Sequence, residues 1–99
     1  MKIKWTNEAL EQLIEIEEFI SKDSSERAAI FVDQLIEHVE DSLPANPRLG
    51  RTVPEIANPV IRELIFKKHR IVYRLTKNSI EIISVFEGHR LLRIDETDF

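Results

Sequence analysis

Side chains that could carry out chemistry are concentrated in the second half of this 99-residue chain. Arg70 and Arg74 flank Val72 in a run of alternating residues, so all three should point to the same face of a β-strand. Guanidinium groups bind carboxylate and phosphate oxygens through paired hydrogen bonds. The pattern favours a partner such as RNA, DNA or an acidic protein segment, although charges on alternate strand positions can also simply face water.

Three further residues could supply acid–base chemistry beside these arginines. Glu55 follows Pro54 in a stiff loop, where a carboxylate could act as general base for a ribose hydroxyl. His89 and Arg90 follow the last strand-like run and could supply a proton donor and a phosphate-binding group. Simpler interpretations remain, since a loop glutamate can neutralise arginines and a histidine can end a sheet or contact a partner. The candidate catalytic set is therefore Glu55, Arg70, His89 and Arg90.

The net charge of −4 conceals a strong asymmetry along the chain. Residues 1–47 carry a net charge of −7, residues 48–94 carry +6, and the acidic C-terminal tail carries −3. Basic residues that cluster on one face form the electrostatic footprint of a phosphate-binding surface. The further candidates for RNA-phosphate binding are Arg48, Arg51, Arg62, Lys67, Lys68, Arg74 and Arg93.

The composition excludes several classes of protein. The absence of cysteine excludes disulfide scaffolds, thiol catalysis and cysteine-ligated zinc. His38, His69 and His89 are too scattered for a local metal site, and no phosphate-binding loop is present, so we expect neither a metal nor a cofactor. No apolar run approaches the roughly 20 residues of a membrane span. We therefore expect a cytoplasmic protein with no membrane partner.

The spacing of apolar residues predicts two helices after a short strand. Residues 2–5 alternate as in a strand, whereas apolar residues recur with helical spacing over residues 8–22 and 26–43. The short connection between the helices predicts an antiparallel helical hairpin. Residues 44–55 contain three prolines and a glycine, which predicts an irregular loop.

Three strand-like runs follow at residues 60–66, 69–75 and 79–86. Short turns between them predict a small antiparallel β-sheet, and one face of this sheet must pack against the helical hairpin. In the last run, alternation groups Ile83 with Val85 and places Phe86 on the opposite face. The expected fold is a single α+β domain that spans residues 1–99.

Five segments stand in a characteristic order: IKWTNEALEQLIEIEEFI, AAIFVDQL, NPRLGRTVPE, IRELIFKKHRIVYRL and IEIISVFEGHRLL. Together they resemble the RelE/ParE superfamily, the toxins of type II toxin–antitoxin modules, over nearly the whole chain. The resemblance implies the same helical hairpin and sheet, and a cognate antitoxin whose tail masks the active surface. We therefore expect a toxin–antitoxin hetero-oligomer. Charge complementarity predicts that the antitoxin binds at least partly on the sheet and the basic half.

The resemblance implies two alternative activities. RelE-type members enter the ribosomal A site and cleave mRNA by driving a ribose 2′-hydroxyl onto the adjacent phosphate, which leaves a cyclic phosphate. ParE-type members inhibit DNA gyrase and have no nuclease chemistry. The chain lacks the GYR…GSH and LH…MD patterns of well-marked gyrase inhibitors. A ribosome-dependent mRNA interferase is therefore the favoured hypothesis, gyrase inhibition is the alternative, and a degenerate toxin that only binds antitoxin is the third.

The resemblance also implies a role for each residue of the candidate catalytic set. Arg70 matches the arginine that stabilises charge on the phosphate in RNase members, and Glu55 falls where some of them keep a general base. His89 and Arg90 fall in the segment that supplies acid and phosphate-binding groups. RNase members often carry a tyrosine in that segment, but no tyrosine follows Tyr73 here. His89 is therefore the candidate that protonates the leaving oxygen.

Overall fold

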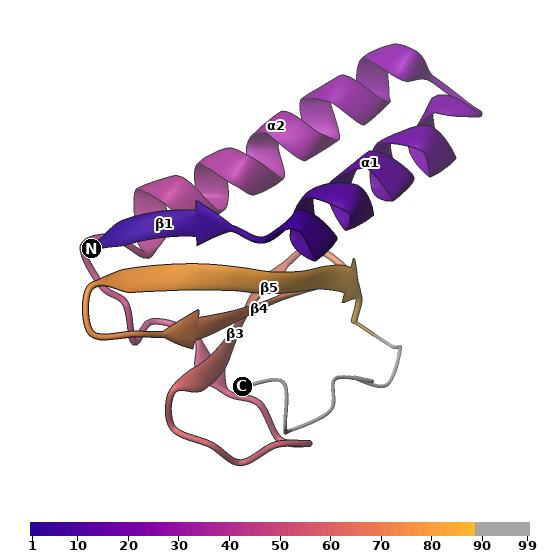
Figure 1. The fold of residues 1–99 in the computed structure, drawn as a ribbon. Helices are drawn as coiled ribbons and strands as arrows, with labels where there is room; N and C mark the ends of the chain where they lie inside the picture. Colours follow the sequence, from indigo (N-terminus) through magenta and orange to yellow (C-terminus); the bar gives the residue numbers. More distant parts are fainter. Residues whose placement is uncertain (89–99) are drawn as a thin grey trace.

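Two helices lie across one face of a β-sheet in this computed structural model, which describes residues 1–88 (Figure 1). The helices are α1 (Asn7–Ser21) and α2 (Ser25–Ser42). The strands within the described residues are β1 (Lys2–Trp5), β2 (Arg51–Thr52), β3 (Ile61–Phe66), β4 (His69–Leu75) and β5 (Ser79–Glu87). The predicted α+β fold, a small antiparallel sheet packed against an antiparallel helical hairpin, is confirmed, with β1 and β5 as a parallel pair in an otherwise antiparallel sheet.

Each helix begins at a side chain that caps its first turn. Oγ1 of Thr6 accepts a hydrogen bond from the backbone amide of Ala9 at 3.2 Å, and Oγ of Ser24 accepts one from the amide of Arg27 at 3.1 Å. These bonds satisfy amides that have no partner inside the helix. Pro44 lies just beyond the end of α2, where it prevents the helix from continuing. Neither helix is long and apolar enough to cross a membrane, and this holds for residues 1–88.

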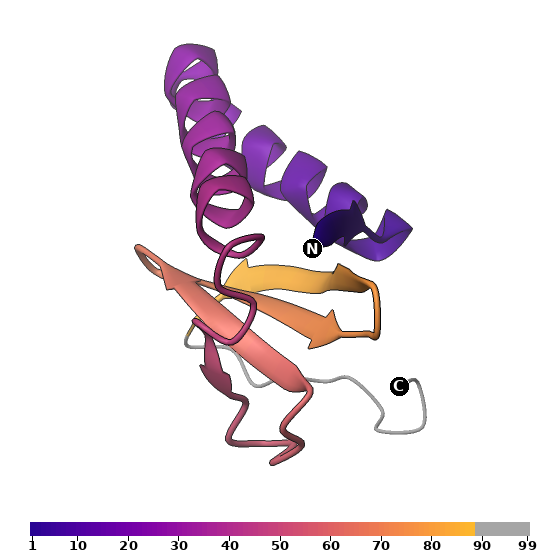
Figure 2. The same cartoon turned by 90° about the vertical axis from the view of Figure 1, so that its left-hand side faces the viewer.

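Within residues 1–88 the strands form one sheet in the order β1-β5-β4-β3-β2. β1 runs parallel to β5, and the other neighbours are antiparallel. Figure 2 shows the helices above the sheet and the loop after β2 below it. The prediction that residues 44–55 are wholly irregular is wrong at Arg51–Thr52, which pair with the outer edge of β3. This pairing gives partners to backbone groups that β3 would otherwise leave open.

Both faces of the sheet carry a buried core. Toward the helices, Leu13 and Leu35 belong to the same apolar cluster as Ile71. On the opposite face, Val53 and Val72 belong to a smaller cluster. The second cluster anchors the loop after β2 against the underside of the sheet, because Val53 lies in that loop and is fully buried.

A β-bulge reverses the faces at the end of β5. The pairing of β4 with β5 shifts between Val72 and Tyr73, where Ile83 is an extra residue in β5. An extra residue inverts the alternation of the side chains that follow it. Val85 therefore packs on the helix side, and Phe86 packs with Ile83 on the underside. The predicted grouping of Ile83 with Val85 is wrong, because simple alternation does not reveal a bulge.

Candidate functional site

Arg70 lies on β4, in the middle of the sheet, and is only 6% exposed. Its guanidinium group donates hydrogen bonds to two carboxylates. Nε lies 2.5 Å from an oxygen of Glu63, while Nη1 and Nη2 lie 2.7 Å and 2.9 Å from the two oxygens of Glu55. The guanidinium carbon also lies 5.3 Å from the centre of the Phe86 ring. The structure thus brings together two members of the predicted catalytic set, Glu55 and Arg70.

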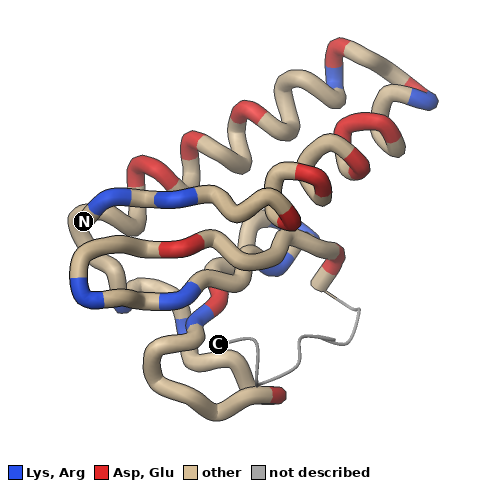
Figure 3. The backbone as a smooth tube through the Cα atoms, viewed as in Figure 1, with Lys and Arg blue, Asp and Glu red and all other residues tan. Residues whose placement is uncertain are grey.

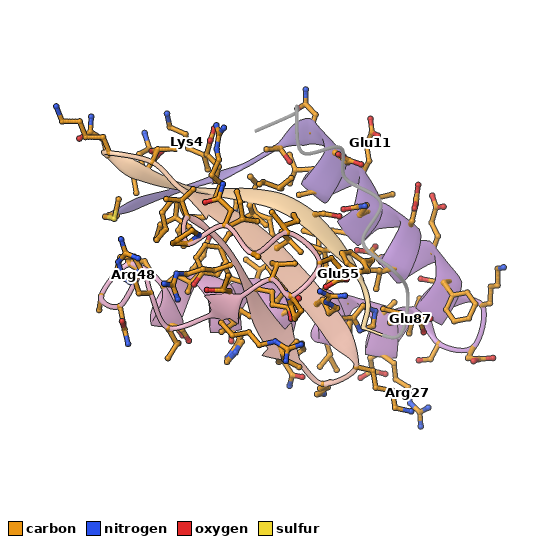
Figure 4. All side chains as sticks on the ribbon, turned by 90° about the horizontal axis from the view of Figure 1, so that it is seen from below. Lys4, Glu11, Arg27, Arg48, Glu55 and Glu87 are labelled. Atoms are coloured by element: carbon orange, nitrogen blue, oxygen red, sulfur yellow. The ribbon has the colours of Figure 1, made fainter. Side chains whose placement is uncertain are left out.

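A tight turn after β2 directs Glu55 toward Arg70. The carbonyl of Val53 accepts hydrogen bonds from the amides of Ile56 at 3.1 Å and Ala57 at 2.8 Å, which closes the chain around Glu55. Ala57 has a φ of 56°, a left-handed conformation that costs an alanine roughly 1–2 kcal/mol. Figure 4 shows Glu55 on this loop, where it crosses the sheet face opposite the helices.

Glu63 is the residue that the sequence-based search for catalytic groups missed. Its side chain is fully buried on β3, and its oxygens accept hydrogen bonds from Nε of Arg51 at 2.6 Å and from Nε of Arg70. Arg51, Glu63, Arg70 and Glu55 therefore form a continuous series of ion pairs, which we call the ion chain. The available signal was a single carboxylate inside the apolar run of residues 60–66, because a buried charge needs a charged partner.

The ion chain keeps Arg70 charged although the residue is buried. The pKa of Arg70 is raised above its ordinary value, and the hydrogen bonds that Arg70 donates to Glu55 contribute most to this; burial acts against the rise, and Glu63 raises the pKa further. Two arginines and two glutamates balance to a formal net charge of zero. Arg70 is therefore a stable internal cation whose hydrogen bonds are directed at carboxylates.

Most of the other predicted phosphate-binding residues have structural partners. Arg74 forms an ion pair with Glu81, with Nε 2.9 Å from the carboxylate. Arg62 donates hydrogen bonds to the carbonyls of Gly50 at 2.8 Å and Pro59 at 3.0 Å, so it holds the loops on either side of β2. Arg48 is exposed, and its own carbonyl accepts a bond from Arg62 at 3.4 Å.

Basic residues within residues 1–88 are spread over several elements, as Figure 3 shows. Lys67 lies at the β3–β4 turn, where its ammonium group sits 5.5 Å from the centre of the Phe31 ring on α2. Lys68 is exposed in the same turn. His89, Arg90 and Arg93 lie outside the described residues, so their predicted roles remain predictions. Among the residues that the structure describes, no group of three or more histidine and acidic side chains could hold a metal ion.

A groove of about 440 Å³ lies between the helices and the end of the sheet. Its walls are mainly apolar, and Glu15 and Glu87 add negative charge. Phe19 lines it from α1 and is 66% exposed, which is high for a phenylalanine. The remaining lining residues are Gln12, Ile16, Ile20, Phe31, His69, Val85 and Phe86.

His69 is the titratable ring in this groove. Its Nδ1 atom is buried and forms no hydrogen bond with the described residues. Burial lowers the pKa of His69 below its ordinary value, and the nearby charge of Glu87 partly opposes this change. The imidazole therefore favours its neutral form, consistent with its packing against the ring of Phe31 at 5.2 Å between centroids.

The sequence profile of the ParE toxins of type II toxin–antitoxin systems matches residues 3–92. This chain belongs to the ParE toxin family. The match includes both helices and the whole ion chain of this ParE-family protein, and it confirms the resemblance to the RelE/ParE superfamily. A comparison with curated proteins finds no significant sequence match.

Solved structures share the fold of this chain. One is the chromosomal ParDE toxin–antitoxin system from P. aeruginosa, with a TM-score of 0.73 and 23% identity over 88% of this chain and 95% of that chain. Another is the RelBE2 toxin–antitoxin complex from Mycobacterium tuberculosis, with a TM-score of 0.63 and 16% identity over 87% of this chain and 95% of that chain. At these identities the likeness establishes the shared fold.

Proposed function

We propose that this ParE-family toxin acts by binding DNA gyrase, without nuclease chemistry, and that a cognate antitoxin neutralises it. The observation that carries the proposal is the enclosure of Arg70, the residue that would have to bind the scissile phosphate of an RNA. Arg70 is only 6% exposed, and its guanidinium group donates hydrogen bonds to Glu63 and Glu55. Membership in the ParE family adds support, since ParE-type members inhibit gyrase.

RNA cleavage would require Glu55 and Arg70 to exchange their hydrogen bonds to each other for hydrogen bonds to the RNA. An RNA phosphate would have to replace a carboxylate that binds Arg70 through two hydrogen bonds. Glu55 would also have to turn an oxygen toward a ribose hydroxyl, because a general base acts only within hydrogen-bond reach of the proton. Binding to a protein target requires neither change. For this reason the geometry favours gyrase inhibition over the RNA cleavage that the sequence favoured.

RNA cleavage is the second candidate, and one observation favours it. The predicted general base, Glu55, and the predicted phosphate-binding arginine, Arg70, come from different parts of the chain. Even so, Nη1 of Arg70 lies 2.7 Å from a carboxylate oxygen of Glu55. Catalytic hydrogen bonds often take their final geometry only when substrate is bound. In this alternative, substrate opens the Glu55–Arg70 pair, and His89 and Arg90 complete the site.

Expression of the Glu55→Gln and His89→Gln variants without antitoxin tests the proposal. Both variants should arrest growth as the wild-type protein does, because gyrase binding needs neither a general base nor a proton donor. Co-purification of each variant with the antitoxin shows that it is folded. Loss of growth arrest in a variant that still binds antitoxin would support RNA cleavage. A wild-type protein that does not arrest growth would instead support the degenerate-toxin hypothesis.

For the antitoxin, we propose a helical segment with apolar and basic residues that occupies the groove. The groove presents exposed aromatic surface, and its two carboxylates complement positive charge. Amphipathic helices commonly bind apolar grooves of this kind. Two solved structures with this fold are toxin–antitoxin systems, which supports a hetero-oligomer. Since α1 and β5 both line the groove, this proposal extends the expected contact surface from the sheet onto the acidic helices.

A further inference from the structure

The edge strand β1 points two lysines to the underside of the sheet. Ile3 and Trp5 of this strand pack against the core on the helix side. Because side chains alternate along a strand, Lys2 and Lys4 point to the opposite face, about 6.6 Å apart. Both lysines are exposed, and no acidic side chain of residues 1–88 forms an ion pair with either of them.

Two further cations continue this group across β5. Strand pairing places Glu81 of β5 between Lys4 and Arg74. Arg74 forms an ion pair with Glu81, yet 33% of the arginine side chain remains exposed. Lys77 lies exposed in the turn between β4 and β5, two residues before Ser79, the pairing partner of Lys2. We call these four cations the basic corner: Lys2, Lys4, Arg74 and Lys77.

The basic corner is a local concentration of positive charge in an acidic protein. Its four cations and the carboxylate of Glu81 sum to a formal charge of +3, whereas the whole chain carries −4. Figure 3 shows blue on β1, on β4 and at the turn between β4 and β5, with red on β5 between them. The acidic helices cover the other face of the sheet, and charges more than about 10 Å apart are largely screened at about 0.1 M salt. An anion at the underside therefore meets mainly the basic corner.

Protection of the sheet edge explains only part of the basic corner. Lysines on an edge strand discourage pairing with a strand of another molecule. This role is sufficient for Lys2 and Lys4. It does not apply to Arg74 and Lys77, which lie on β4 and in the β4–β5 turn, away from the outer edge of β1.

We propose that the basic corner binds the phosphate backbone of double-stranded DNA without reading its sequence. Duplex DNA carries one negative charge per roughly 1.7 Å of helix axis, and proteins neutralise its phosphates with lysine and arginine. Three of the four cations are lysines, which are depleted from protein–protein interfaces. The aromatic rings of Trp5 and Tyr73 on these strands pack toward the helices. The bases of a single strand, which stack on aromatic rings, would therefore find no ring of β1 or β4 beside the basic corner.

Titration of a fluorescent duplex of mixed sequence with the full-length protein, followed by anisotropy, tests this inference. Four phosphate contacts predict that the logarithm of the binding constant falls with the logarithm of salt concentration with a slope of about −3.6. The triple variant Lys2→Gln/Lys4→Gln/Lys77→Gln should flatten this slope by about 2.7 and bind at least about tenfold more weakly at low salt. Thermal unfolding checks that the variant is folded.

The matched control removes the same charge from exposed positions elsewhere. Lys22→Gln/Arg27→Gln/Lys68→Gln should leave the affinity for duplex DNA within about twofold of the wild-type value. An equal loss in the control would overturn the inference, because net charge alone would then explain binding. If the first variant does not fold, the wild-type protein still decides, since a salt slope near zero would contradict contact with phosphates.

Competition experiments separate duplex DNA from other anionic partners. Unlabelled duplex DNA should displace the probe better than single-stranded DNA, RNA or polyglutamate at equal concentration of charge. Better competition by single-stranded DNA or RNA would assign the basic corner to another nucleic acid, and better competition by polyglutamate would assign it to an acidic protein. Either result would overturn the inference. It goes beyond the proposed function, because these measurements contain no gyrase and each idea can fail without the other.

Discussion

Arg70 binds two carboxylates that differ in burial and in the kind of element that carries them. Glu63 is fixed on a strand and holds the guanidinium in place, whereas Glu55 approaches from an exposed loop. The sequence predicted Glu55 and Arg70 as partners in chemistry from their types and from family resemblance. It did not predict Glu63, because a glutamate in a strand is read as solvent-facing until the strand register shows what covers it.

Substitution of Glu63 should cost more stability than substitution of any exposed glutamate. Glu63→Gln removes the charge shared by Arg51 and Arg70, and loss of one partner from a buried ion pair costs about 3 kcal/mol. Glu81→Gln, at a more exposed pair, should cost less than about 1 kcal/mol. Urea unfolding measures both. Equal losses of unfolding free energy would show that Glu63 has no special role.

His69 should make stability depend on pH in the mildly acidic range. Its pKa in the folded protein is below the ordinary value of 6.5, so between these two values the unfolded chain binds more protons. The stability that neutral His69 contributes is therefore fully present above about pH 6.5, and it declines as the pH falls toward the pKa of His69 in the folded protein. Urea unfolding at about pH 7.5 and about pH 5.5 measures this change. Between these two pH values, the free energy of unfolding should fall less for His69→Gln than for the wild-type protein. Identical losses would contradict the prediction.

The loop between α2 and β3 is the element that completes the site. Oη of Tyr73 on β4 accepts a hydrogen bond from the amide of Gly50 at 2.8 Å and donates one to the carbonyl of Pro47, also at 2.8 Å. These bonds, together with buried Val53, fix the path that brings Glu55 over Arg70. The loop is thus part of the fold rather than a loose connection.

Gly50→Ala should destabilise the loop between α2 and β3. A Cβ atom at Gly50 would lie 2.5 Å from the carbonyl oxygen of Glu63 and 2.6 Å from Oη of Tyr73. Such overpacking typically costs about 1–3 kcal/mol. Ala57→Gly in the same loop should have the opposite sign, because Ala57 has a φ of 56°. Thermal unfolding of both variants checks the prediction, which fails if the two midpoints shift in the same direction.

The elements themselves were largely predictable from the sequence, and the exceptions have local causes. Helical spacing, capping side chains and turn residues identified both helices and β3 to β5, because these signals lie within one segment. β2 was missed, since two residues joined to the edge of β3 leave no periodic pattern. The bulge at Ile83 was missed because it is a property of the pairing between β4 and β5. Both missed features depend on contacts between strands, so the residue pattern within one segment could not reveal them.

The charge asymmetry of the whole molecule acquires a different meaning in the structure. The positive charge of the second half is spread over the described elements and partly neutralised within the ion chain and by Glu81. The acidic helices, in contrast, border the apolar groove. A partner with basic and apolar residues would therefore meet its complement at the groove.

Phe19→Ser should weaken antitoxin binding while it leaves the fold intact. Phe19 lines the groove and is 66% exposed, so its loss removes contact area for a partner more than core packing. An aromatic anchor of this kind contributes about 2 kcal/mol, or roughly a thirtyfold change in Kd. Ile30→Ser on α2 is the matched control, because Ile30 is 49% exposed and is not among the groove residues. Calorimetric titration would contradict the prediction if both variants weakened binding equally.

We propose that this ParE-family toxin inhibits its target by binding rather than by cleaving RNA. The most direct measurement compares the purified protein in a gyrase supercoiling reaction and in a translation extract whose mRNA is mapped by primer extension. Gyrase–DNA cleavage complexes should accumulate while mRNA on the ribosome stays intact. Cut mRNA on stalled ribosomes, with gyrase activity unchanged, would contradict it.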